Sequence, residues 1–223
     1  MKSYYTATSQ IRYYGQVPET VGKTADAVSG TGVRSTLFGG NVLTQAEWTH
    51  FLETATEQPF DLSRRKEPVH ERLANMTLDV DSLYVFTKVW GFLDAEVDDK
   101  GRLVARPQHL EQFQDLLQRA WRGDTKALSE MAKDVKARVD VGAKGIDIAV
   151  VDLWNLVRLS FLRDYKAGRT KVCANEDCPS PYFLEQRKGQ KYCTHKCAVL
   201  VNVRRFRERQ AKTKSQPKRR AQR

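Results

Sequence analysis

The spacing of apolar residues along the chain predicts a mainly helical fold with short strands. The first forty residues are rich in glycine, which favours loops or short strands over helices. Thr44 and Glu47 then form a capping box at the start of a helix predicted over residues 45–56. The apolar face of this helix consists of Trp48, Phe51 and Leu52.

The next apolar patterns predict a helix and a small hairpin. Residues 57–78 are polar and contain two prolines, so they are expected to form a loop, or a loop and a short helix. After Asp81 a second helix is predicted. Its apolar face would be Leu83, Val85, Phe86, Val89, Trp90 and Leu93. Residues 95–97 and 103–105 flank a turn sequence and are expected to pair as short strands.

The most regular helical pattern begins at Pro107, a residue favoured in the first turn, and stops at Gly123. The residues at i, i+3 and i+4 spacing are Leu110, Phe113, Leu116, Leu117, Ala120 and Trp121. Asp124 can cap a second, shorter helix. The predicted inner face of that helix is Leu128, Met131, Ala132 and Val135.

The last part of the N-terminal region reads as a strand followed by a buried helix. Residues 137–141 alternate and favour a strand, whereas residues 148–165 are apolar around most of a helix and are expected at the centre of the core. Gly168 should end this helix, only a few residues before the first cysteine. The fold class is therefore mainly α (α+β): a helical N-terminal domain with short strands over 1–170, then a small four-cysteine module of hairpin and helix over 171–211 and a disordered basic tail over 212–223.

Length and hydropathy restrict the broad class of protein. A chain of 223 residues can bury a sizeable core without disulfides. No stretch approaches the roughly 18 uninterrupted apolar residues of a membrane span, and the N-terminus lacks the pattern of a secretion signal. We expect a cytoplasmic protein that does not cross the membrane.

The charge is concentrated at one end of the chain. Residues 173–223 contain 14 Lys and Arg against 4 Asp and Glu, so they carry a net charge of +10 out of the +11 of the whole chain. Such a confined excess suggests a polyanionic partner.

All four cysteines lie in this basic segment, with the spacing Cys173-x4-Cys178-x14-Cys193-x3-Cys197. Two close pairs of soft donors suit one tetrahedral zinc ion, and four thiolates leave no open position for catalysis, so a structural Zn2+ is predicted. Two disulfides or four ordinary buried cysteines are the alternatives, disfavoured in a reducing compartment. His195 is expected to be exposed and not to be a ligand.

The residues between the cysteine pairs are expected to form a hairpin. Its strands would be residues 182–184 and 191–192, joined by a turn over 187–190. Beyond Cys197 we predict a helix that packs through Val199, Val203 and Phe206 and turns its basic side outward. The candidate nucleic-acid contacts are Arg187, Lys188, Lys191, Arg204, Arg205, Arg207, Arg209 and Lys212.

The segment from Cys173 to Arg207 resembles the CGNR-type zinc finger, a family in which the finger follows a mostly helical ABATE domain. The matching residues are the four cysteines, Phe183, Tyr192, Val203, Arg204, Arg205, Phe206 and Arg207. The chain has Ala198, Val199 and Leu200 where the family has Gly-Asn-Arg. The resemblance implies a bacterial DNA-binding regulator whose N-terminal domain senses a ligand.

These observations favour a zinc-dependent nucleic-acid-binding protein, with DNA preferred over RNA, acting in transcription regulation. A small-molecule effector and a homodimer are compatible with the helical domain. A protein-protein adaptor is the first alternative. A nuclease is disfavoured because the four histidines (His50, His70, His109 and His195) are scattered and lie in no recognisable motif. We therefore expect no enzymatic activity and no catalytic residues.

Overall fold

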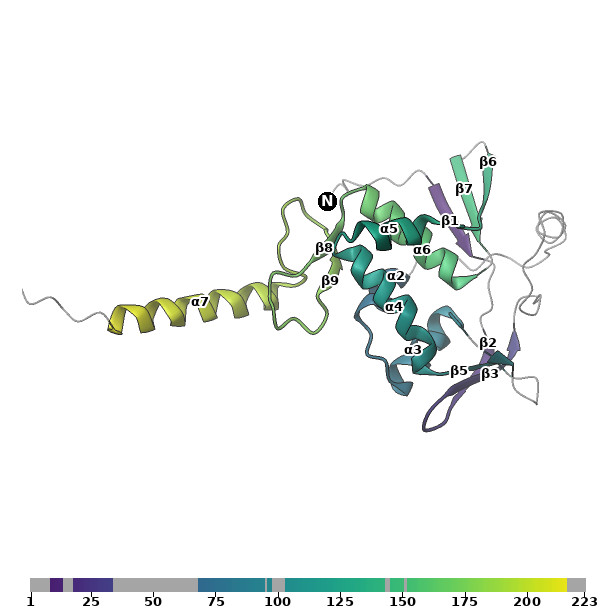
Figure 1. Cartoon of the computed structure of the whole chain (residues 1–223), viewed down its shortest axis with the longest axis horizontal. Helices are drawn as coiled ribbons and strands as arrows, with labels where there is room; N and C mark the ends of the chain where they lie inside the picture. Colours follow the sequence, from purple (N-terminus) through teal and green to yellow (C-terminus); the bar gives the residue numbers. More distant parts are fainter. Residues whose placement is uncertain are drawn as a thin grey trace, which may run out of the picture.

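A computed structural model of the chain describes residues 9–13, 18–33, 68–94, 96–97, 103–142, 145–150 and 152–215. Within these residues the fold is mainly helical with short strands, as the sequence predicts. Figure 1 shows a helical body, and one long helix that extends away from it. The helix predicted over residues 45–56 lies outside the described residues.

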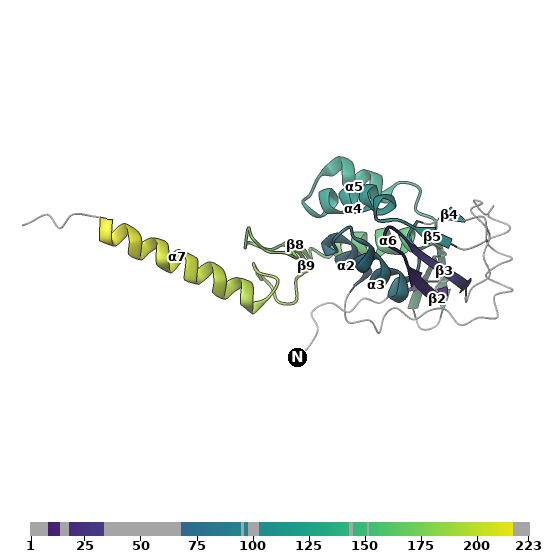
Figure 2. The same cartoon turned by 90° about the horizontal axis from the view of Figure 1, so that it is seen from below.

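Among the described residues, five helices of the body pack around an apolar core. They are α2 (Val69–Asn75), α3 (Val80–Trp90), α4 (Pro107–Trp121), α5 (Thr125–Ala132) and α6 (Leu153–Lys166). Their buried side chains include Leu73, Phe86, Leu110, Leu117, Met131 and Phe161. The view in Figure 2 shows α2 and α3 on one side of this body and α4 and α5 on the other.

The ends of these helices follow from capping residues. The side chain of Asp79 accepts a hydrogen bond from the Ser82 amide, so α3 begins slightly earlier than its apolar pattern suggests. Asp124 caps α5 as predicted, accepting from the amides of Lys126 and Ala127. Gly123, with φ of 87°, ends α4 in the left-handed region that glycine adopts at low cost.

The inner face of α5 differs from the prediction. Ala127 and Met131, four residues apart, are buried against the core, and Leu128 is half-buried. Ala132 is exposed, because one further residue turns it about 100° away from Met131. Val135 lies beyond the end of the helix.

Among the described residues, two small sheets flank the helices. The antiparallel sheet has the order β2-β3-β5-β4, formed by β2 (Pro18–Lys23), β3 (Val28–Val33), β5 (Leu103–Ala105) and β4 (Glu96–Val97). It contains the predicted hairpin, which the two N-terminal strands extend. The other sheet has the order β1-β7-β6, with β1 (Ser9–Tyr13) parallel to β7 (Gly145–Val150) and β6 (Arg138–Gly142) antiparallel to it.

The helix predicted over residues 148–165 is wrong at its start. Residues 145–150 form the central strand β7, with Ile148 paired to Ile11 on one side and Val139 on the other. The helix α6 begins after Asp152, whose side chain accepts from the Asn155 amide. The remaining part is buried over most of its circumference, as predicted, and ends before Gly168 at φ of 69°.

The cysteine-rich end begins directly after α6. Strand β8 (Thr170–Val172) pairs antiparallel with β9 (Tyr182–Leu184), and the chain then continues to α7 (His195–Ser215). Both views show α7 as a rod pointing away from the body (Figures 1 and 2). No helix among the described residues is long and apolar enough to cross a bilayer.

Candidate metal centre

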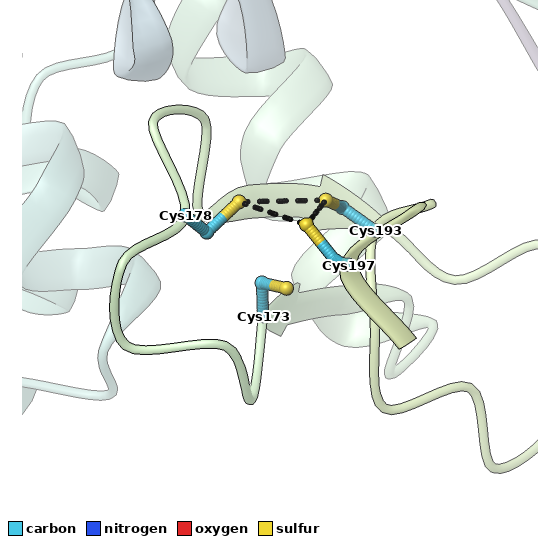
Figure 3. Close-up of side chains that lie close together, drawn as sticks. All are labelled: Cys173, Cys178, Cys193 and Cys197. Atoms are coloured by element: carbon cyan, nitrogen blue, oxygen red, sulfur yellow. Dashed lines mark hydrogen bonds between the residues drawn. The ribbon is translucent and has the colours of Figure 1, made fainter. Parts of the chain in front are cut away.

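The four cysteines come from three separate backbone segments and meet at one point. Cys173 directly follows β8, Cys178 lies in the loop before β9, and Cys193 and Cys197 stand at the start of α7. Their sulfur atoms all lie within 4.8 Å of one another. Figure 3 shows the four side chains converging, with contacts drawn between three of the sulfurs.

The sulfur separations fit one tetrahedral metal ion. The Sγ atoms of Cys178, Cys193 and Cys197 are 3.5, 3.6 and 3.7 Å apart. A tetrahedron with metal–sulfur bonds of about 2.3 Å has edges of about 3.8 Å. A disulfide would require about 2.05 Å, and all four cysteines are free thiols. The cluster can therefore hold one metal ion, and a set of four thiolates is typical of zinc.

The surroundings separate the cluster from solvent on one side. Cys173 and Cys197 are buried, and together with buried Phe183 they form a small apolar cluster that Tyr192 completes. His195 is exposed at the first residue of α7 and lies outside the group of potential ligands, as predicted. Four sulfur ligands would fill the coordination shell, which is the arrangement of a structural site.

The pKa values of the cysteine thiols also favour a bound cation within the cluster. Burial raises the pKa values of Cys178 and Cys193. Burial acts on Cys197 in the same direction, but hydrogen bonds from Asn175, Thr194 and the neighbouring thiols outweigh it and lower the pKa of Cys197 to about 7. The Nδ2 atom of Asn175 lies 3.6 Å from this sulfur. The Cys197 thiol is thus ready to ionise near neutral pH, whereas the thiols of Cys178 and Cys193 need the charge of a bound metal.

The predicted hairpin between the cysteine pairs is only half correct. Residues 182–184 form a strand, but its partner is β8, with Phe183 opposite Lys171. The predicted return strand at residues 191–192 is irregular. The Lys191 carbonyl accepts from the Ala174 amide at 2.9 Å, and the Tyr192 carbonyl accepts from the side-chain amide of Gln190 at 2.8 Å. Just before them, the Glu185 carboxylate accepts from the amides of Gly189 and Gln190. The result is a tight turn, not an extended strand.

Strand β9 joins the metal cluster to the core of the body. Tyr182 and Leu184 belong to the main core, whereas Phe183 packs with the cysteines. The side-chain amide of Asn75 donates to the Tyr182 carbonyl at 2.6 Å and accepts from the Tyr182 amide at 3.0 Å. Trp121 Nε1 donates to the carbonyl of Lys171 at 2.9 Å. The metal module therefore rests on α2 and α4 through specific contacts.

The helix α7 faces the module with a side opposite to the one predicted. Cys197 and Val201 are buried, and Arg204, on the same side two turns on, pairs with Asp177. Val199, Val203 and Phe206 are exposed by 43%, 41% and 55%. The prediction that these three residues pack is wrong. The position of Cys197 in the cysteine cluster fixes which side of α7 faces the module, and the helical period places the apolar stripe opposite.

The candidate nucleic-acid-binding residues lie in two parts of the structure. Arg187, Lys188 and Lys191 are exposed in the turn held by Glu185. The remaining five lie on α7: Arg204, Arg205, Arg207, Arg209 and Lys212. Arg204 differs from the others because its guanidinium pairs with Asp177. Charge counting did not reveal that role, since an ion pair between residues 27 positions apart leaves no local signal.

The comparisons with known proteins add no family to this geometry. No protein-family model matches the chain, and no curated protein matches it. The four-cysteine cluster fits the resemblance to a zinc finger, while membership of the CGNR family and of the ABATE-type helical domains stays a prediction.

Proposed function

We propose that this chain is a zinc-dependent nucleic-acid-binding protein, a DNA-binding regulator that contacts its target through α7. The observation that carries the proposal is the combination of charge and exposure on this helix. It contains seven Lys and Arg and one acidic residue, Glu208. Residues 202–211 are all exposed, and the helix points away from the body (Figure 1).

The metal would give this cationic helix a fixed direction. Cys197 in its first turn would be a zinc ligand, and the pair between Arg204 and Asp177 ties the next turns to the loop between the first two cysteines. Each cation placed near a phosphate releases condensed counterions, so a rigid row of arginines supports strong, salt-dependent binding. Residues 1–170 would serve as the domain that senses an effector or dimerises. The proposal assigns the chain no catalytic step.

A protein-protein adaptor is the second candidate, favoured by the exposed stripe of Val199, Val203 and Phe206. An apolar surface of this kind is common at protein interfaces. The net charge of α7 would restrict such a partner to an acidic surface.

Binding to duplex DNA, single-stranded DNA and RNA over a salt series tests the proposal on the full chain. The variant Arg205→Gln/Arg207→Gln/Arg209→Gln removes three exposed cations and leaves the pair of Arg204 intact. We expect weaker binding and a slope of log affinity against log salt that is shallower by about 0.9 for each lost phosphate contact.

The matched control is Lys126→Gln/Lys133→Gln/Lys136→Gln, which removes the same charge from exposed positions on and after α5. Its affinity and salt slope should stay close to those of the parent protein. An equal loss of affinity in the two triple variants would contradict the proposal, because binding would then depend on the net charge of the protein and not on α7.

A further inference from the structure

One side of α7 is exposed, uncharged and partly apolar. We call it the outer face of α7 and define it by Val199, Asn202, Val203, Phe206 and Gln210. All five residues are exposed. At about 100° per residue they occupy roughly a 100° sector, opposite the side that carries Cys197, Val201 and Arg204. The outer face is therefore turned away from the metal module.

Cations border the outer face on both sides. The same helical period places Lys196 and Arg207 along one edge and Arg205 and Arg209 along the other. All four are exposed. The surface is thus a strip of apolar and amide side chains between two rows of positive charge.

The charge of the helix narrows the class of partner. A second copy of α7 would bring together two segments with seven cations and one anion each, so self-pairing through this face is disfavoured. An anionic membrane fits poorly, because interfacial helices carry apolar residues along their length, and residues 207–215 of α7 include no large apolar residue. A nucleic acid offers negative charge on both sides of a central surface.

Groove geometry selects the kind of nucleic acid. The major groove of B-form DNA is about 12 Å wide and admits an α-helix, with phosphates along both walls and base edges on the floor. The major groove of duplex RNA is too deep and narrow for side chains to read. The helix α7 has 21 residues and extends about 32 Å, so it is long enough to lie along the major groove of B-form DNA.

We propose that α7 enters the DNA major groove with its outer face toward the bases, where Val203 and Phe206 contact thymine methyl groups and Asn202 and Gln210 bind adenine edges. Apolar side chains pair with the C5-methyl of thymine, and Asn or Gln can bind the N6 and N7 atoms of adenine. The flanking cations contact phosphates. This inference rests on the proposed function and extends it from phosphate contacts to a preference for A·T base pairs.

The experiment starts with the full chain and a pool of DNA duplexes with a randomised centre. Duplexes enriched by binding should be richer in A·T pairs than the pool. In the enriched sequence each thymine is then replaced by deoxyuridine, which lacks only the methyl group. We expect affinity to fall about fourfold for each contacted methyl, the effect of losing one buried CH3 group.

The variant Val203→Ala/Phe206→Ala should bind the thymine and deoxyuridine duplexes equally. Because both side chains are exposed, its zinc content and unfolding midpoint should match the parent protein. Val85→Ala/Tyr165→Ala is the matched control: it shortens one valine and one aromatic residue that are exposed on the body, and should keep the discrimination. In Asn202→Ala/Gln210→Ala, replacing adenine by 7-deazaadenine should no longer weaken binding.

Failure of the two proposals can be told apart. Absence of binding to any duplex at low salt would overturn the proposed function and this inference with it. Binding without A·T enrichment, without discrimination against deoxyuridine, or with discrimination retained in Val203→Ala/Phe206→Ala would overturn this inference alone. Binding to vesicles of anionic phospholipid that requires Phe206, in place of sequence-dependent DNA binding, would also overturn it.

Discussion

The helices α4 and α7 both carry an apolar stripe in their sequence, yet the stripe of α4 faces the core of the body and that of α7 faces solvent. In α4, Leu110, Leu117 and Trp121 are buried in the core of the body. In α7, Val199, Val203 and Phe206 are exposed, and the buried residues on the opposite side are Cys197 and Val201. The comparison teaches that a hydrophobic stripe identifies one side of a helix, whereas the surrounding chain decides whether that side is covered.

The reason for the difference lies in what holds each helix. The body fixes α4 by burying side chains along its whole length, so the apolar stripe must face inward. The module fixes only the first half of α7, through Cys197, Val201 and Arg204. The position of Cys197 in the cysteine cluster sets the direction of α7, and the stripe then faces wherever the helical period places it.

The largest expected effect comes from removing a ligand. Cys197→Ser should reduce the zinc content from one ion per chain to none. In zinc-finger peptides with a complete ligand set, the free energy of zinc binding is about 10–16 kcal/mol, and three thiolates rarely hold a structural zinc ion this tightly. Elemental analysis and limited trypsin digestion measure this. We expect residues 173–215 to become sensitive while α4 stays protected.

The control for this change is His195→Ser, two residues earlier at an exposed position, which should keep both zinc and protection. Full zinc content in Cys197→Ser would break the comparison, since α7 would then be held by something other than the metal.

Two phenylalanines test burial directly. Phe161 is fully buried on α6, whereas Phe206 is 55% exposed on α7. Phe161→Ala should lower the free energy of unfolding by about 3–5 kcal/mol, and Phe206→Ala should change it by no more than about 0.5 kcal/mol. Urea denaturation of zinc-loaded protein gives both values. A large cost for Phe206→Ala would mean that the stripe is covered after all.

The attachment of the module to the body depends on Asn75. Asn75→Ala removes both side-chain hydrogen bonds to the Tyr182 backbone and should cost about 1–3 kcal/mol of unfolding free energy. After zinc chelation, the same substitution should lower the unfolding free energy by less, because β9 would be less ordered. An equal cost with and without zinc would show that the contact does not couple metal site and body.

The smallest expected effect is a pH dependence from His70 in the body. Its Nε2 lies 3.2 Å from Oδ2 of Asp164. The same oxygen lies 3.6 Å from Arg163, and Oδ1 of Asp164 lies 3.1 Å from Arg169. Burial lowers the pKa of His70 below its ordinary value of 6.5, and the Asp164 carboxylate only partly opposes this. Below that pH the unfolded chain binds a proton that the folded chain resists. Stability should therefore be complete above about pH 6.5 and decline as the pH falls toward the folded value.

Thermal unfolding between pH 7.5 and about pH 5.5 measures this decline. His70→Gln should flatten the curve, and His195→Gln, at an exposed position, should leave it unchanged. A curve that keeps its slope in His70→Gln would assign the acid sensitivity to other groups, such as the thiols.

Local sequence signals predicted the parts of the fold that depend on local chemistry. Pro107, Gly123 and Asp124 marked the ends of two helices, and the cysteine spacing marked the metal cluster, because caps and chelating pairs act over a few residues. The strand β7 was missed because periodicity alone cannot assign a short apolar run to a helix or a strand. Its β-branched residues Ile146, Ile148 and Val150 favour a strand, and the strand pairs with β1, more than 130 residues earlier.

The candidate site was predictable in its ligands but not in its supports. The pairing of β9 with β8 and the contacts of Asn75 and Asp177 join residues that are far apart in the chain. The outward orientation of Phe206 depends on these supports and on the position of Cys197, so periodicity alone gave the opposite answer.

The alternation along β9 limits how this finger could be moved to another protein. An engineer who cut the chain before Thr170 would keep every cysteine but would strip the cover from Tyr182 and Leu184, which lie in the core of the body. The excised piece would expose the apolar side chains of Tyr182 and Leu184 on one face of β9. Grafted elsewhere, it would need a host surface shaped like α2 and α4, so the finger and its helical body are best exchanged as one unit.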